Sequence, residues 1–266
     1  MKATVRSLAR AIAPLFASVL WGIPEIAVAQ FNLQPLSIEA TATRGQAQGV
    51  VSITNVTEEP FRGRVYAEPF TYSAEGFQLL SESPMDLTPY LVFAPREFVI
   101  EPGQTRQVRT VARLLPSLPE GEYRAILFVE NLDEVTSETG GSTVGIRPRL
   151  GATFFVRYGD LEAEIAVGGA RFDAENQQFV LNVTNSGTAS AKVRTTWQLE
   201  SEGAQVSEGY VGVYTVVPGN ERNIEIRLPE EATPLAADLY ELSGELTWDD
   251  NESLSFEMEV PAETTP

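Results

Sequence analysis

The sequence predicts an all-β protein made of two immunoglobulin-like β-sandwich domains in tandem. Apolar and polar residues alternate with a period of two along short segments, which Gly, Pro and Asn turns separate. No segment after residue 29 keeps a helical period over three turns. An internal repeat also divides the chain into two similar halves, as expected for two domains of one fold.

The alternation is clearest in three segments of the second half. Residues 224–228, 240–248 and 254–260 place apolar side chains at nearly every second position, with polar side chains between them. Such a pattern gives a strand one buried face and one solvated face, which is typical of antiparallel sheets.

The repeat consists of two short motifs that occur once in each half. Residues 51–55 (VSITN) correspond to 181–185 (LNVTN), each a strand that ends in a turn-forming Asn. Residues 100–103 (IEPG) correspond to 216–219 (VVPG), and each Pro-Gly turn precedes another strand.

A tyrosine follows each Pro-Gly turn at nearly the same spacing. Residues 118–123 (LPEGEY) have the form of a tyrosine corner, in which the tyrosine hydroxyl binds the backbone a few residues before the strand that contains the tyrosine (strand F of the immunoglobulin fold). Residues 235–240 are a weaker copy. We therefore expect domains at 30–158 and 159–266, with a junction near 157–159. A single larger β-sandwich is the alternative.

The first 29 residues have the features of a secretory signal peptide. Three basic residues precede an apolar stretch over 11–23, and residues 27–29 (AVA) are small, as a cleavage site requires. The apolar stretch is short for the roughly 30 Å hydrocarbon core of a bilayer. We expect cleavage after residue 29 and a soluble mature chain, without an integral membrane segment, in a bacterial periplasm.

Missing residue types exclude most catalytic chemistry. The chain has no His and no Cys, and its only lysines are Lys2 and Lys192. There is therefore no imidazole base, thiolate nucleophile, disulfide, or metal site built from Cys or His. We expect no enzyme activity, no catalytic residue, and no cofactor or metal ion.

The net charge of −18 at pH 7 excludes further partners. Nucleic acids and anionic lipid surfaces attract Lys and Arg and would repel this chain. We interpret the acidity as a feature of solubility and expect no nucleic-acid partner.

The chain resembles the periplasmic pilus-assembly chaperones, a family that folds fimbrial subunits. The resemblance covers nearly the whole mature chain, and residues 36–158 resemble the family best. The matching motifs, in order, are ITN at 53–55, Pro95, Pro102-Gly103, QVR at 107–109, Leu118-Pro119 and FFVR at 154–157. The resemblance implies two immunoglobulin-like domains at an angle, an export signal, and no use of ATP or metal.

The resemblance also implies a working strand. In that family the last strand of the first domain, strand G, completes a subunit that lacks its own last strand, through main-chain hydrogen bonds and alternate apolar side chains. The equivalent here is the loop 131–143 followed by a strand over 144–156. Its subunit-binding side chains would be Val144, Ile146, Leu150 and Ala152.

An ordinary strand that packs its own sandwich would show the same alternation, and this alternative stays open. Two details favour a strand with a partner. The preceding strand is apolar on both faces over 125–129, so its second face needs a cover. Pro148 has no N–H to donate to a neighbouring strand, and it therefore belongs to a sheet edge.

The sequence departs from the family at the anchor for the subunit's terminal carboxylate. The family has an Arg in the first strand and a Lys in the middle of strand G, but Glu39 and Thr153 stand at the corresponding positions here. Glu39 would repel a carboxylate. The candidates for a displaced anchor are Arg44, Arg147 and Arg149.

The sequence therefore predicts a periplasmic chaperone-like protein that binds and stabilises an exported pilin-like subunit by donating its G strand, without ATP. The resemblance leaves open whether an outer-membrane usher takes part. The alternative is a structural or adhesive immunoglobulin-like protein of the envelope or cell surface. Such a protein would occur in a polymer or at the surface, rather than in a one-to-one complex with a subunit.

Overall fold

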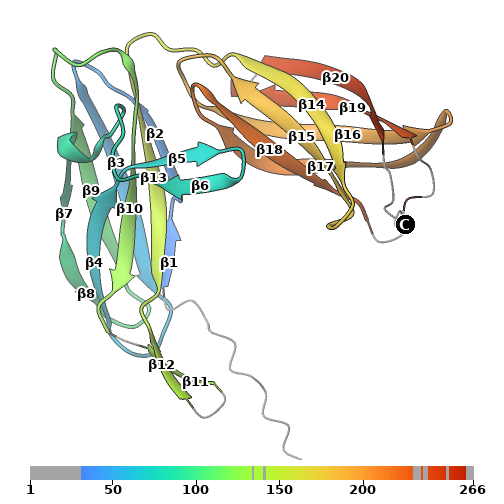
Figure 1. Ribbon diagram of the computed structural model, residues 1–266. Helices are drawn as coiled ribbons and strands as arrows, with labels where there is room; N and C mark the ends of the chain where they lie inside the picture. The colour runs from blue at the N-terminus through green and yellow to red at the C-terminus, as the bar shows by residue number, and fades with distance from the viewer. Residues whose placement is uncertain are drawn as a thin grey trace, which may run out of the picture.

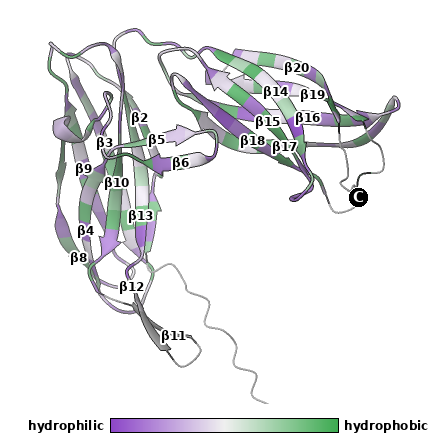
Figure 2. Ribbon diagram, in the orientation of Figure 1, coloured by the Kyte–Doolittle hydropathy of each residue, from purple (hydrophilic) through white to green (hydrophobic). Residues whose placement is uncertain are grey.

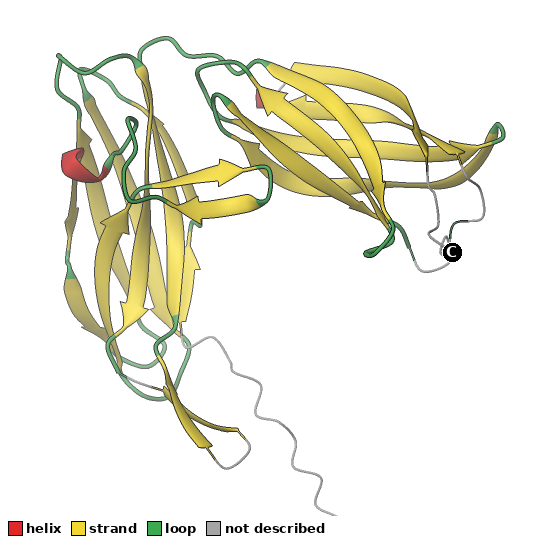
Figure 3. Cartoon of the chain, in the orientation of Figure 1, coloured by secondary structure: helices red, strands yellow, loops and turns green. Residues whose placement is uncertain are grey.

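The computed structural model describes residues 31–133, 135–139, 142–229, 235, 239–249 and 252–261. The predicted signal peptide at 1–29 lies outside these residues. Strands make up most of the described chain, and the short 3-10 helix η1 (Thr88–Tyr90) lies in its first half (Figure 3). Within the described ranges, no helix has the length and apolar character needed to cross a membrane. The all-β prediction is confirmed.

The first sandwich packs a four-stranded sheet on a five-stranded sheet (Figure 1). The four-stranded sheet has the order β1 (Phe31–Gln34), β3 (Gln46–Asn55), β9 (Thr105–Arg113) and β7 (Leu91–Ala94). The five-stranded sheet has the order β2 (Ser37–Thr41), β13 (Arg149–Tyr158), β10 (Gly121–Asn131), β4 (Phe61–Glu68) and β8 (Glu97–Ile100). Neighbouring strands are antiparallel except for β2 and β13, which are parallel.

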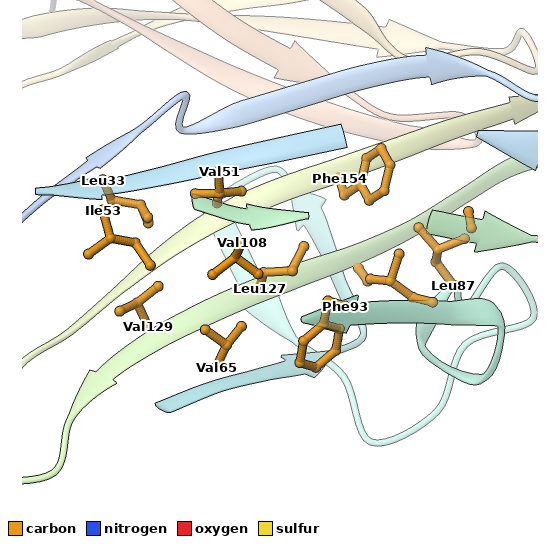
Figure 4. Close-up of a cluster of buried hydrophobic side chains, with 14 of the residues drawn as sticks. Leu33, Val51, Ile53, Val65, Leu87, Phe93, Val108, Leu127, Val129 and Phe154 are labelled. Atoms are coloured by element: carbon orange, nitrogen blue, oxygen red, sulfur yellow. The ribbon is translucent and has the colours of Figure 1, made fainter. Parts of the chain in front are cut away.

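The first core lies between these two sheets. Alternate residues of each strand face it, and the strands accordingly show alternating bands of hydropathy (Figure 2). Figure 4 shows side chains from both layers meeting, among them Ile53 and Val108 from one sheet and Leu127 and Phe154 from the other. The period-two pattern thus forms a core because every second side chain on each layer points at the opposite layer.

The second sandwich has its own separate core. Its three-stranded sheet has the order β14 (Ile165–Asp173), β15 (Gln178–Asn185) and β18 (Asn220–Arg227). Its four-stranded sheet has the order β17 (Ala204–Val216), β16 (Ala191–Ser201), β19 (Leu239–Trp248) and β20 (Glu252–Pro261). Two cores exclude the alternative of a single larger sandwich. The chain passes from the first sandwich to the second between Tyr158 and Ile165.

The repeated Asn has the same structural role in both sandwiches. The Asn55 side chain is fully buried, and its Nδ2 donates to the carbonyl oxygens of Glu59 and Ile100 at 2.8 and 2.9 Å. Asn185 repeats this arrangement, because its Nδ2 donates to the carbonyl oxygens of Ala189 and Val216 at 2.8 and 2.9 Å. The repeated Asn therefore has a structural reason. In each sandwich its side-chain amide donates to two backbone carbonyl groups, one in the turn that follows the Asn and one just before the Pro-Gly turn, and so joins these two segments.

The tyrosine corner predicted from the sequence is present in the first sandwich. The Tyr123 hydroxyl donates to the carbonyl oxygen of Pro119 at 2.9 Å, and the Tyr123 side chain is buried. In the weaker second copy, residues 236–238 lie outside the described residues.

A hairpin of the first sandwich reaches the second (Figure 1). It consists of β5 (Phe70–Ser73) and β6 (Gly76–Leu79). The Asn223 N–H of β18 donates to the carbonyl oxygen of Ala74 at 3.0 Å, and Arg222 Nη1 donates to that of Ser73 at 3.1 Å. The Arg222 guanidinium also lies 5.8 Å from the centre of the Tyr72 ring. The hairpin therefore fixes one sandwich against the other through backbone and cation–π contacts.

A charged cluster forms a second contact between the sandwiches. The Glu122 carboxylate accepts a hydrogen bond from the Ser190 N–H at 2.9 Å and another from the Ser190 hydroxyl. Arg157 Nε lies 3.8 Å from the same carboxylate, and Arg157 Nη2 donates to the Ser190 carbonyl oxygen at 2.9 Å. Lys192 forms an ion pair with Glu39. Because Glu122 is buried and fully partnered, this contact has little tolerance for a shift between the sandwiches.

We expect Asn185→Ala to lower the free energy of unfolding of the second sandwich by about 2–4 kcal/mol, because buried backbone groups lose their partners. Asn182 on the same strand is the matched control, since among the described residues its Nδ2 donates to the side chains of Glu221 and Asn223 and to no backbone carbonyl. Asn182→Ala should cost about 0.5 kcal/mol. Urea unfolding followed by circular dichroism measures both, and equal losses would contradict the role given to Asn185.

Candidate functional site

The first sandwich has an open strand edge at the predicted working strand. β13 pairs with β10 along its whole length, but β2 covers its other edge only from Thr153 to Arg157. Residues 149–152 therefore have no neighbouring strand on that side among the described residues. Just before β13 in the chain, β11 (Val135–Thr139) and β12 (Ser142–Ile146) form a projecting hairpin (Figure 1), in which β12 pairs with β11 and with no other described strand. An unpaired edge thus runs along residues 142–152.

The expected continuous strand over 144–156 is interrupted. β12 ends at Ile146 and β13 begins at Arg149, with Arg147 and Pro148 between them. Pro148 has no N–H, so it cannot continue the ladder. Its carbonyl oxygen instead accepts a hydrogen bond from the Asn131 N–H at 3.1 Å, which joins the interruption to the end of β10.

The predicted subunit-binding residues divide between two environments. Ala152 is fully buried in the core of its own sandwich, and Leu150 is partly buried against that core. The backbones of Val144 and Ile146 pair with Ser137 and Val135 in the projecting hairpin, but their side chains lie outside the described part of the structure. The expectation that Ala152 faces a partner is therefore wrong, because its side of β13 faces the four-stranded sheet.

The second apolar face of β10 is covered by the chain itself. Ile126 and Phe128 are 5% and 6% exposed, although they point away from the first core. Phe70 of β5 and Val217 of the second sandwich pack against them. The inference that an exposed face of this strand favours an external partner is therefore wrong, because the β5–β6 hairpin and the second sandwich supply the cover.

The three candidate anchor arginines do not form one site. Arg44 is exposed in the turn between β2 and β3, close to the end of β13 where Thr41 pairs with Arg157. Arg149 lies eight residues from Arg157 on the same strand, which places the two ends roughly 26 Å apart. Arg147 is exposed at the interruption, next to the open edge. Of the three candidates, therefore, Arg147 and Arg149 lie beside the open edge, and Arg44 does not.

Arg149 is held in place by aromatic residues. Its Nη1 donates to the Tyr66 hydroxyl at 3.0 Å, and its guanidinium lies 4.3 Å from the centre of the Phe128 ring. The hydrogen bond to Tyr66 raises the pKa of the guanidinium, so its charge is permanent.

The positions expected for the family's anchor have partners within the chain. Glu39 forms the ion pair with Lys192 of the second sandwich. The hydroxyl of Thr153 is 3.3 Å from the Leu36 carbonyl oxygen, to which it donates. Glu39 therefore joins the two sandwiches, and Thr153 supports the pairing of β13 with the chain at the start of β2.

Sequence reasoning missed a buried arginine between the sandwiches. The Arg124 side chain is 9% exposed and lines a cavity of about 390 Å³ together with Met85 of the first sandwich and Thr188 and Gly219 of the second. Burial lowers its pKa, and the nearby carboxylate of Glu122, at 3.7 Å from Nη1, opposes that effect. The available signal was the pair of charged residues that flanks Tyr123, directly before the apolar run over 125–129.

No family model matches the chain, and no curated protein matches it in sequence. Its fold is similar to that of several solved fimbrial chaperones. The CsuC–CsuE chaperone–tip adhesion subunit complex of Acinetobacter baumannii is 13% identical, with 87% of this chain and 98% of that chain covered and a TM-score of 0.49. The Salmonella enterica complex of the SafA pilin with the SafB chaperone is 13% identical, with coverages of 89% and 98% and a TM-score of 0.46. The Pseudomonas aeruginosa CupB2 chaperone is 15% identical, with coverages of 86% and 100% and a TM-score of 0.45.

At these identities the likeness is one of fold. The chemistry open to the site follows instead from the strands described above. No group of three or more acidic residues in the described ranges is arranged to hold a metal ion. What the first sandwich offers is an unpaired backbone edge with apolar and basic side chains beside it, and that arrangement suits the pairing of another strand.

Phe70→Ala should expose the apolar face of β10 and lower the free energy of unfolding by about 3–4 kcal/mol. Dye binding that reports apolar surface should rise, because Ile126, Phe128 and Phe155 lose their cover. Phe77 stacks on Phe70 but is 42% exposed, so Phe77→Ala is the control and should lose less than half as much. If Phe70→Ala is as stable as the control, the hairpin does not serve as the cover.

Proposed function

We propose that the mature chain is an exported, ATP-independent chaperone that captures a pilin-like subunit by pairing with it along the edge of residues 142–152. The observation that carries this proposal is the unpaired edge of β12 and of the first four residues of β13. The motif resemblance between residues 36–158 and the pilus-assembly chaperones supports it. The predicted signal peptide supports a periplasmic location for the proposed activity.

The edge has both the hydrogen-bonding groups and the apolar side chains that strand addition needs. The Thr153 N–H donates to the Leu36 carbonyl oxygen at 3.0 Å, so the N–H groups on this side of β13 point away from β10. By the alternation of a strand, the Arg149 N–H points to the open side as well. An incoming strand would therefore continue the ladder that β2 begins.

The apolar contribution would come from Val144, Ile146 and Leu36, with a smaller part from Leu150, whose side chain is already partly buried against its own core. Leu36 is 61% exposed immediately before β2, at the end of the open edge. Three or four such side chains at about 1–2 kcal/mol each, offset by the cost of association, support a micromolar or tighter complex. The free energy comes from pairing and burial, so the proposed activity needs no nucleotide or metal ion.

We expect the tagged mature chain to be recovered from periplasmic extracts of its host in a one-to-one complex with an exported subunit that aggregates when the chain is deleted. Ile146→Glu and Arg149→Pro should each reduce the recovered subunit by about tenfold or more, since they remove an apolar contact and an edge N–H. Mass spectrometry and quantitative gel analysis measure the ratio.

Two controls make the result specific. Arg149→Ala separates loss of the edge N–H from loss of the guanidinium, and it should retain more subunit than Arg149→Pro. Arg171→Glu changes an exposed residue of the second sandwich and should leave recovery unchanged. Unchanged capture by Ile146→Glu and Arg149→Pro would show that this edge is not the binding site, and recovery of the chain in a polymer attached to the cell surface, with no subunit bound, would favour a structural or adhesive role.

A further inference from the structure

One outer sheet face of the first sandwich is basic in an otherwise acidic protein. The chain has 37 Asp and Glu against 19 Lys and Arg, yet strands β1, β3, β9 and β7 contain no acidic residue. Arg109 and Arg113 lie opposite Val50 and Gln46 of β3 on the solvent face. Val50 and Val92 on this face are 42% and 56% exposed. Exposed Arg beside apolar side chains is typical of protein interfaces.

Neither Arg109 nor Arg113 forms an ion pair with any of the described residues. We name this surface, defined by Val50, Val92, Arg109 and Arg113, the arginine face.

A complementary face lies on the second sandwich. Glu200, Glu241 and Glu259 stand directly opposite one another on the adjacent strands β16, β19 and β20. Glu241 and Glu259 are exposed, and Glu200 is half-buried and accepts a hydrogen bond from the Gln198 side chain at 2.7 Å. All three lie on the outer face of the sheet, because their neighbours Leu199, Leu242 and Val260 are fully buried in the second core. We name these three residues the glutamate face.

The glutamate row is unfavourable for the isolated chain. Like charges directly opposite each other on neighbouring strands destabilise a sheet. Residues 159–266 hold 5 basic and 21 acidic side chains, a net charge of −16, whereas residues 30–158 hold 11 and 15, a net charge of −4. The charge of the chain is therefore separated between its two sandwiches.

The two faces do not meet within one copy. The sandwiches contact each other through the β5–β6 hairpin and through the cluster around Glu122, and neither contact uses the arginine face or the glutamate face. Both faces therefore stay available to another molecule.

We infer that the arginine face of one copy docks on the glutamate face of a second copy. The two faces have opposite charges, which supports a second copy as the occupant. Because every copy carries both faces, a complementary partner is always present in solution. Net repulsion between acidic copies is largely screened beyond about 8 Å at physiological salt, so the local charges at contact decide the outcome. The contact is heterologous, and it therefore joins copies into a closed ring or an open chain.

Sedimentation velocity of the mature full-length chain tests this inference. At about 20 mM salt the weight-average sedimentation coefficient should rise with protein concentration, and at about 0.5 M salt it should fall back towards that of the monomer. The double variant R109E/R113E and the double variant E241R/E259R should each lower the association constant by about tenfold or more.

Mixing the two reversed variants is the decisive step. Each alone has two faces of one sign, but together they present complementary pairs, so the mixture should regain association. R171E is the control and should associate like the unchanged chain, and circular dichroism verifies that every variant is folded. A monomer at all concentrations in low salt, association that neither reversal affects, or a mixture that stays monomeric would each overturn the inference.

Discussion

Strand β10 is buried on both of its faces, and this constraint determines how the rest of the molecule is arranged. Tyr123 and Leu127 fill the first core from one face, while Ile126 and Phe128 lie under the β5–β6 hairpin on the other. The same hairpin hydrogen-bonds to β18, so covering β10 also fixes the second sandwich against the first. The neighbouring strand β13 pairs with β10 along one edge. Part of its other edge stays open, because β2 pairs with it only from Thr153 onward.

Local rules were sufficient to predict the sandwiches from the sequence. The period-two pattern predicts the strands because each contributes one face to a core, and the repeated Asn predicts two copies because one buried amide serves the same turn in each. The cover of β10 could not be predicted in this way. Phe70 and Tyr72 belong to β5, a strand that is too short to show a period, and their packing with Val217 joins positions about 150 residues apart in sequence.

The candidate site was only partly accessible from the sequence for a related reason. Alternation assigns residues to two faces, but it does not say which face meets the chain's own core. Leu150 and Ala152 share a face with Phe154, and that face belongs to the first core. The property that matters for strand addition is the unpaired edge, which depends on where β2 begins to pair. That position is a tertiary feature, set by the passage of the chain from β1 to β2.

The open edge also carries its own protection against pairing with a copy of itself. Pro148 interrupts its middle, and exposed Arg147 and Arg149 flank that interruption. Two copies paired antiparallel about Pro148 would place Arg147 of each opposite Arg149 of the other, and the two prolines would donate no hydrogen bonds at the centre. A different strand with neutral or acidic residues at this point meets neither obstacle. The edge is therefore open to a partner while being unfavourable for self-pairing, a combination that a strand-lending chaperone requires and that a spacer domain does not.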